Sequence, residues 1–262
     1  MVSRKWLWLA MAGVSSALVA CGGGGSSVEP VSLDPTVLCN SAGVQPKVFN
    51  GASCVSYRST PVILLLIENA DSSYSSCSGT RISENQVLTA GHCVSDGPKR
   101  VIAGNFLSDS SVTGLNATSW VVHPAYSPIG FVNDAAVVSF PGGLPNPTMP
   151  VLASESARKG QAVFFAGWGL PSEELAVGAA NLSDVSNEYL TINFDGAQSN
   201  TCQGDSGGPM YRTLPSGAAL IGITSSGTAA ACGAGERSNF TNVHTPTVLN
   251  FIREHAPAAA FI

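Results

Sequence analysis

Short apolar runs alternate with turn-rich stretches along most of the chain, and this pattern predicts strands rather than helices. The run from Val62 to Ile67 is bounded by polar residues and is too short for a typical helix, which favours a buried strand. Further strand candidates follow the same logic: 77–82, 86–90, 100–104, 119–123, 135–140, 161–169, 188–194, 220–225 and 240–243. The pattern therefore predicts an all-β protein.

Two stretches depart from this pattern. Segment 141–147 (PGGLPNP) is too rich in helix and strand breakers for regular structure, so it is expected to connect two lobes. The dipeptide Thr245-Pro246 has the pattern of a helix cap with a proline in the first turn. It predicts a closing helix over 247–255.

The first 20 residues have the pattern of an export signal. Arg4 and Lys5 form a basic start, and residues 6–19 form an apolar core too short for a lasting membrane helix. The following Cys21 completes a sequence that resembles the bacterial lipoprotein box, whose cysteine receives a diacylglyceryl group. An ordinary signal peptide with an incidental cysteine is the alternative. The Gly/Ser run 22–27 favours the lipoprotein, because it forms a flexible tether.

This interpretation sets the expected organisation and location of the chain. The expected parts are a signal peptide over 1–20, a tether and short pro-segment over 21–47, a main domain over 48–256 and a tail over 257–262. Acylation implies a bacterial cell envelope, at the outer membrane or facing the periplasm. Secretion is expected if the box is not used.

Composition supports an exported β protein. Charged residues make up only 11% of the chain, whereas it has 28 glycines and 16 prolines, which suits a loop-rich fold. The formal net charge of -5 becomes more negative once Arg4 and Lys5 leave with the signal. An acidic chain gives no reason to expect a nucleic-acid partner.

The stretch from Thr201 to Pro209 carries the clearest chemical signal. A serine held among glycines on a tight loop can present its hydroxyl to a substrate carbonyl. The N–H groups of Gly204 and Ser206 can then point together at the oxygen that becomes negative during attack. The six residues GDSGGP occur by chance in about one chain in 10⁵ of this length. The stretch therefore indicates acyl transfer.

This stretch resembles the nucleophile loop of the chymotrypsin/trypsin-like serine peptidases. Leu88–Cys93 resembles the family's histidine loop, and Asn133–Val138 resembles its aspartate strand. The order His, Asp, Ser is that of this fold, whereas subtilisins and α/β-hydrolases have other orders. The resemblance implies two antiparallel six-stranded β-barrels, over about 48–140 and 150–256, with the active site between them and a C-terminal α-helix.

The resemblance also assigns the catalytic roles. A serine hydroxyl needs a base that takes its proton, and a histidine titrating near neutrality suits this task. Ser206 is thus the expected nucleophile, His92 the base, and Asp134 the residue that fixes the imidazole tautomer. Gly204 and Ser206 are expected to form the oxyanion hole. Three further histidines lie in no catalytic motif: His123, His244 and His255.

The sequence Lys47-Val48-Phe49-Asn50-Gly51 resembles the family's activation junction. In the family, a cut after the basic residue frees an α-amine that pairs with the aspartate before the nucleophile, here Asp205. Because buried charge is costly unless paired, the Val48–Asp205 ion pair can act as a latch for the oxyanion hole. An edge strand beginning at Val48 is the alternative. The hypothesis is a zymogen cut between Lys47 and Val48.

Seven cysteines become six once Cys21 is assigned to the lipid, and an even count in an exported chain indicates disulfides. Spacing alone permits 15 connectivities. The resemblance implies two bridges and leaves a third pair: Cys77–Cys93, Cys202–Cys232 and Cys39–Cys54. The last bridge would keep the pro-segment attached after cutting. No Cys-x-x-Cys spacing indicates a metal site, and no cofactor is expected.

The resemblance places Asn200 at the base of the substrate pocket, where trypsin-like members have an aspartate. Asn200 lacks the charge, so neutral side chains of small to medium size are expected. An inward-turned Glu236 would instead restore a preference for basic side chains. Ser226 stands where an aromatic residue is usual, which predicts an altered contact. The expected pocket residues are Asn200, Thr201, Ser225, Ser226, Gly227 and Ser238.

The sequence thus predicts a serine endopeptidase that acts on proteins or peptides through an acyl-enzyme intermediate. Two alternatives are a catalytically silent binding module on the same fold and an esterase with the same triad. All three triad residues are present, which favours an enzyme. A monomer is expected, held to a membrane through the lipid at Cys21.

Overall fold

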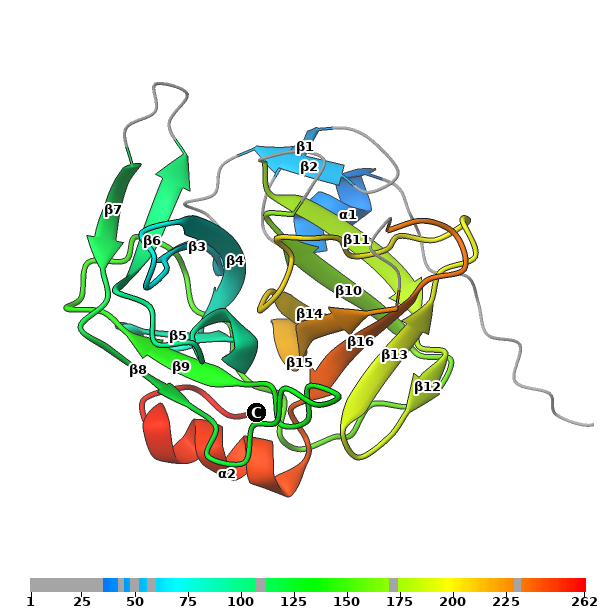
Figure 1. Cartoon of the computed structure of the whole chain (residues 1–262). Coiled ribbons are helices and arrows are strands. Elements are labelled where there is room, and N and C mark those ends of the chain that lie inside the picture. Colours follow the sequence, from blue (N-terminus) through cyan, green and yellow to red (C-terminus); the bar gives the residue numbers. More distant parts are fainter. Residues whose placement is uncertain are drawn as a thin grey trace, which may run out of the picture.

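The computed structural model describes residues 35–41, 45–47, 52–55, 60–106, 112–169, 174–228 and 232–262. Two antiparallel sheets lie side by side, and the C-terminal helix closes the molecule beneath the first of them (Figure 1). The predicted all-β fold with two antiparallel lobes and a C-terminal helix is confirmed. The described residues contain no helix with the length and apolar character that crossing a membrane requires.

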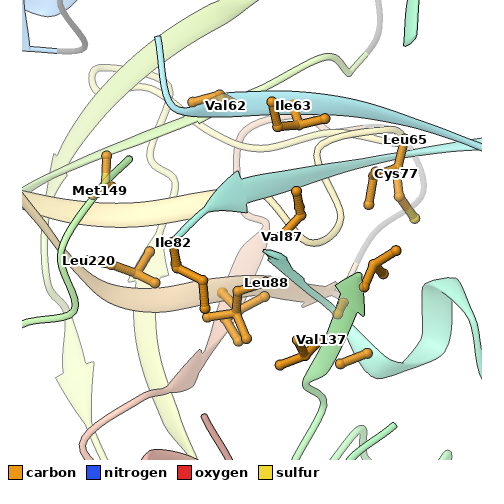
Figure 2. Close-up of a cluster of buried hydrophobic side chains, with 14 of the residues drawn as sticks. Val62, Ile63, Leu65, Cys77, Ile82, Val87, Leu88, Val137, Met149 and Leu220 are labelled. Atoms are coloured by element: carbon orange, nitrogen blue, oxygen red, sulfur yellow. The ribbon is translucent and has the colours of Figure 1, made fainter. Parts of the chain in front are cut away.

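The first sheet has seven strands, in the order β7-β6-β3-β4-β5-β9-β8. Their bounds are β3 Val62–Glu68, β4 Tyr74–Arg81, β5 Gln86–Thr89, β6 Arg100–Phe106, β7 Val112–Asn116, β8 Ser119–Val122 and β9 Ala136–Ser139. Strand β3 pairs with both β4 and β6. Its apolar residues are buried on both faces, which explains why the run is continuous rather than alternating. Figure 2 shows part of this core, which includes Met149 and Leu220 from beyond the first sheet.

The second sheet has nine strands, in the order β1-β2-β11-β10-β14-β15-β16-β13-β12. Their bounds are β1 Gln45–Lys47, β2 Ala52–Val55, β10 Ala162–Gly167, β11 Ala176–Asn181, β12 Asp184–Val185, β13 Tyr189–Asn193, β14 Pro209–Leu214, β15 Gly217–Gly227 and β16 Arg237–Asn242. The sheets thus have seven and nine strands where six each were predicted. Part of the excess is β1, from the predicted pro-segment, which pairs with β2 at the edge beside β11.

The N-terminal described residues fold onto the second lobe, although their amino-acid pattern has no clear periodicity. Helix α1 (Pro35–Ser41) lies with β1 and β2 beside β11 (Figure 1). Cys39 is fully buried, and the hydroxyls of Ser41 and Tyr211 are 2.9 Å apart. Seven residues make only two turns, which is too few for a recognisable apolar period. Part of the predicted pro-segment therefore belongs to the folded domain.

Helix α2 (Pro246–His255) follows the second lobe in sequence but packs on the first. Its apolar face, including Phe251, is buried in the main core, and Gln86 Nε2 on β5 donates to the His255 carbonyl at 2.7 Å. Beyond the helix, the Ile262 N–H donates to the Val151 carbonyl at 3.0 Å. The predicted tail is therefore paired with the segment that joins the lobes.

Candidate active site

Strand pairing in the first lobe brings the predicted base and acid together. His92 lies on the short 3₁₀ helix Gly91–Cys93 that follows β5, and Asp134 lies just before β9. Strands β5 and β9 are paired, with Thr89 opposite Ala136. The His92 main-chain N–H donates to Asp134 Oδ1 at 2.8 Å, and Nδ1 lies 2.7 Å from Oδ2. Because a carboxylate only accepts, this geometry places the imidazole proton on Nδ1 and leaves Nε2 as a base.

Asp134 is fully buried, and its oxygens are supplied with hydrogen bonds from both lobes. Ser225 on β15 donates its hydroxyl to Oδ2 at 2.6 Å. Thr241 on β16 donates its hydroxyl to the main-chain carbonyl of Asp134 at 3.0 Å. The bonds from His92 and Ser225 offset part of the cost of burying the carboxylate, and the Thr241 bond fixes the main chain beside it. Sequence analysis placed Ser225 only in the substrate pocket and missed this support for Asp134.

Ser206 lies on the loop before β14, and this loop is attached to the first lobe. The Ser78 N–H on β4 donates to the Ser206 carbonyl at 2.7 Å. The next residue, Gly207, has φ +82, and a Cβ there would collide with the Thr89 hydroxyl and the Ser78 carbonyl. Glycine is therefore required for the nucleophile loop to approach the strands that lead to His92.

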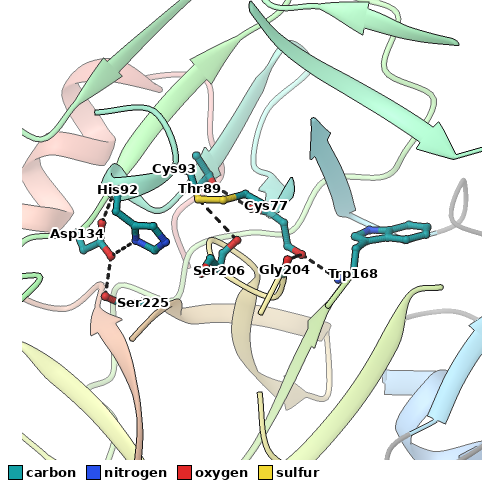
Figure 3. The surroundings of a disulfide bond; sticks show 10 residues. Cys77, Thr89, His92, Cys93, Asp134, Trp168, Gly204, Ser206 and Ser225 are labelled. Atoms are coloured by element: carbon teal, nitrogen blue, oxygen red, sulfur yellow. Dashed lines mark hydrogen bonds and ion pairs between the residues drawn. A yellow bond between two sulfur atoms is a disulfide. The ribbon is translucent and has the colours of Figure 1, made fainter. Parts of the chain in front are cut away.

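The predicted nucleophile and base face the same space. His92 and Ser206 both line a cavity of about 540 Å³ beside the Cys77–Cys93 disulfide. Figure 3 shows Asp134, the His92 ring and Ser206 in this order across the view, below that disulfide. The imidazole is partly exposed, at 23%, so substrate and water can reach it. The structure thus places His92 and Ser206 on one cleft, with Asp134 buried and hydrogen-bonded to His92.

The predicted oxyanion donors have no competing partners among the described residues. The N–H groups of Asp205 and Gly207 donate to main-chain carbonyls, whereas those of Gly204 and Ser206 make no such bond. Gly204 has φ +96, a conformation that a side chain would strain. Two free, fixed N–H donors beside a nucleophile are suited to stabilising an oxyanion.

The structure contains the two disulfides that the family resemblance implied, Cys77–Cys93 and Cys202–Cys232. Cys39 is also disulfide-bonded, but the side chain of its expected partner Cys54 lies outside the described residues, as does Cys21. Across the described residues, one group has the spacing of a metal site: Cys77, His92 and Cys93. Its two sulfurs are bonded to each other, so they are not thiolate ligands.

Comparison with known proteins decides the family. A sequence model described as Trypsin matches residues 49–252, which is most of the chain. The chain belongs to the trypsin family of serine endopeptidases.

Relatives of this trypsin-family chain cover most of its domain. Brachyurin from Leptuca pugilator is 32% identical over 198 residues, which are 64% of this chain and 82% of that protein. A trypsin-like protease from Streptomyces glaucescens is 28% identical over 209 residues, covering 70% and 75% respectively. A solved structure titled HL collagenase superposes with a TM-score of 0.62 at 21% identity, covering 75% of this chain and 93% of its own. The last comparison supports the fold alone.

In this trypsin-family chain, Asp205 precedes the predicted nucleophile, is buried and has no cationic partner among the described residues. Its carboxylate accepts from the Gly169 and Cys202 N–H groups, each at 2.8 Å. Burial raises the pKa of Asp205 to about 6, and these two hydrogen bonds limit the rise. Val48, the expected partner, lies outside the described residues.

Most of the residues predicted for the substrate pocket of this trypsin-family chain line one cavity. A cavity of about 310 Å³ opens beside Ser206 and is lined by four of the expected residues: Thr201, Ser225, Ser226 and Gly227. Asn200 and Ser238 do not line it, because their side chains bond to each other behind the wall. Glu236 lines it instead and is 4% exposed. No local signal in the sequence fixed the direction of this side chain.

Proposed function

We propose that the chain hydrolyses peptide bonds in proteins or peptides through an acyl-enzyme intermediate. One observation carries the proposal: His92, which is hydrogen-bonded to the buried Asp134, lines the same cleft as Ser206. A buried aspartate, a histidine or a loop serine alone is common in purely structural roles. Asp134, His92 and Ser206 together, at the junction of two lobes, form the arrangement that acyl transfer uses.

The chemistry follows from these positions. His92 Nε2 takes the proton of the Ser206 hydroxyl as the oxygen attacks the substrate carbonyl. The resulting oxyanion is held by the Gly204 and Ser206 N–H groups. His92 then gives the proton to the departing amine, and a water molecule repeats the sequence to release the acid. Asp134 stays ionised and stabilises the imidazolium.

The alternatives are separated by a substrate comparison. After a cut at Lys47, the protein is incubated with a peptide library and with matched peptide esters. An endopeptidase cleaves internal amide bonds at rates well above those of the Ser206→Ala variant. Cleavage of esters alone would favour the esterase, and no turnover of either substrate would favour the binding module.

We also infer that the enzyme is made as a zymogen cut between Lys47 and Val48. Ala52 on β2 pairs with Val177, which in turn pairs with Ala166 on β10. Since neighbouring strands lie about 4.8 Å apart, Ala52 is about 10 Å from β10.

Val48 and Ala52 are separated by four residue-to-residue steps, which can span up to about 13 Å. Gly167, the residue after Ala166, packs directly against the Asp205 side chain. A freed Val48 amine is therefore within reach of Asp205, a buried carboxylate with no cationic partner among the described residues.

This proposal predicts a pH-dependent gain in stability on cutting. The raised pKa of Asp205 means that the uncut folded state holds its proton to higher pH than the unfolded state does. The uncut chain therefore loses stability as the pH rises from about 4 to about 6, by about 3 kcal/mol for a shift of this size. An ammonium partner removes this loss. Denaturant unfolding of cut and uncut Ser206→Ala protein at pH 4, 6 and 8 measures the difference.

The increase in the free energy of unfolding on cutting is expected to be large at pH 8 and small at pH 4. Acetylation of the new Val48 amine is the control and is expected to abolish it. A gain that does not change with pH, or that survives acetylation, would contradict the ion pair.

We further propose that the enzyme is a monomer anchored to the bacterial envelope by a lipid on Cys21. Folding of α1 and the buried, disulfide-bonded Cys39 support retention of this tether after the cut. Membrane fractionation tests the anchor, since the Cys21→Ser variant is expected in the soluble fraction.

A further inference from the structure

Glu236 occupies an unusual position for a carboxylate in the described structure. It lies one residue before β16, in the wall of the cavity that opens beside Ser206, and is 4% exposed. The opposing wall at Gly227 has no side chain, and a Cβ there would collide with Glu236 Oε1. The absence of a side chain at Gly227 thus leaves room for the carboxylate to lie inside the pocket.

A chain of side-chain hydrogen bonds fixes the direction of this carboxylate. Thr201 donates its hydroxyl to Ser238 at 3.1 Å, and Ser238 donates to Asn200 Oδ1 at 2.7 Å. With its oxygen engaged in this way, the Asn200 amide nitrogen faces Glu236 and donates to Oε2 at 2.9 Å. Asn200 and Ser238 therefore hold Glu236 in place rather than contact a substrate.

The charge of Glu236 lacks a cationic partner within the described residues. No lysine, arginine or histidine there forms an ion pair with it, and its one side-chain donor is the neutral amide of Asn200. The adjacent Arg237 is exposed. A buried carboxylate with one neutral donor leaves much of its desolvation cost unmet. A cation that entered the cavity would meet that cost.

We propose that Glu236 makes this pocket select lysine and arginine as the residue before the cleaved bond. The inference rests on the proposed peptidase function and deepens it. The cavity lies at the small end of ligand pockets, about 300–1,000 Å³, which suits one side chain. Hydroxyls of Ser226 and Thr228 in its wall can accept further hydrogen bonds from an ammonium or guanidinium. The expectation of neutral side chains from Asn200 is replaced, because Glu236, held by the Asn200 amide, supplies the charge.

The test uses peptide amides that differ only in this residue: Lys, Arg, Gln or Met. The wild-type protein, cut at Lys47, is expected to have a kcat/KM at least about 100-fold higher for Lys and Arg than for Gln and Met. In Glu236→Gln, the values for Lys and Arg are expected to fall by about 100-fold, while those for Met stay within about threefold. Binding of benzamidine, an amidinium probe, is expected to weaken by a similar factor.

Glu254→Gln on α2 makes the same substitution at an exposed carboxylate and is expected to keep the wild-type profile. Labelling of Ser206 by a neutral fluorophosphonate reports whether the catalytic groups of Glu236→Gln still work. If Glu236→Gln does not fold, the inference is tested by the wild-type protein alone, through its preference among the four peptides and its affinity for benzamidine.

Two results would overturn the inference while the peptidase function stands: a labelled wild-type enzyme that cleaves best after neutral residues, or a Glu236→Gln variant that keeps its preference for Lys and Arg. A wild-type enzyme that neither labels nor cleaves any substrate would instead contradict the proposed function itself.

Discussion

Replacement of Ser206 by alanine is expected to lower the turnover of a peptide substrate by about 10⁶ and to leave the fold intact. The loss follows because the variant has no oxygen that can form the acyl-enzyme, whereas the Ser206 main-chain contacts that attach the loop to β4 remain. Steady-state kinetics of the cut protein measures the loss, and thermal melting checks the fold.

Two comparisons sharpen this result. Ser186→Ala removes an exposed hydroxyl in the turn before β13 and is expected to retain wild-type turnover. The double variant Ser206→Ala, His92→Ala is expected to be no slower than either single variant, because residues that act as one unit are not additive. Turnover of Ser206→Ala within tenfold of wild type would show that another group is the nucleophile.

Asp134→Asn is expected to lower kcat by about 10⁴ at neutral pH, the loss known for the corresponding change in other enzymes with this triad. The carboxylate accepts from the His92 main chain, the His92 ring and Ser225. An amide has one accepting oxygen and cannot serve all three donors, so the imidazole loses its tautomer and its electrostatic support. Kinetics at saturating substrate measures the effect, since KM is expected to change little.

Ser225→Ala is the matched comparison for this variant. It removes one donor to Asp134 and leaves both His92 bonds, so a loss of only about tenfold is expected, as for one hydrogen bond to a charged group. Equal losses in the two variants would indicate that the hydrogen-bond network is structural and that Asp134 has no separate effect on His92.

Some of these features were predictable because they depend on local patterns. The continuous apolar run of β3 identified a buried strand, and Thr245-Pro246 marked the start of α2. The positions of His92, Asp134 and Ser206 followed from three short motifs in a defined order. Glycine in such a motif is required for steric reasons and can be recognised from one sequence. Gly207 is the example, because a side chain there would collide with the first lobe.

Other features depend on contacts between distant segments and had no local signal. Ser225 and Asp134 are 91 residues apart in sequence, so their hydrogen bond could not be read from either motif. The direction of Glu236 depends on Asn200 and on the space at Gly227, which come from other parts of the second lobe. Helix α1 is too short for a periodic pattern, and its place beside β11 is fixed by tertiary packing.

The central claim is that Ser206, activated by His92, attacks an electrophile bound in the cleft. Mass spectrometry of the fluorophosphonate-treated protein tests it most directly, because the adduct can be assigned to one residue. We expect a single adduct on Ser206 in the cut wild-type protein, and no adduct in Ser206→Ala or His92→Ala at the same exposure. An adduct on a different residue, or labelling of Ser206→Ala at the wild-type rate, would contradict the account.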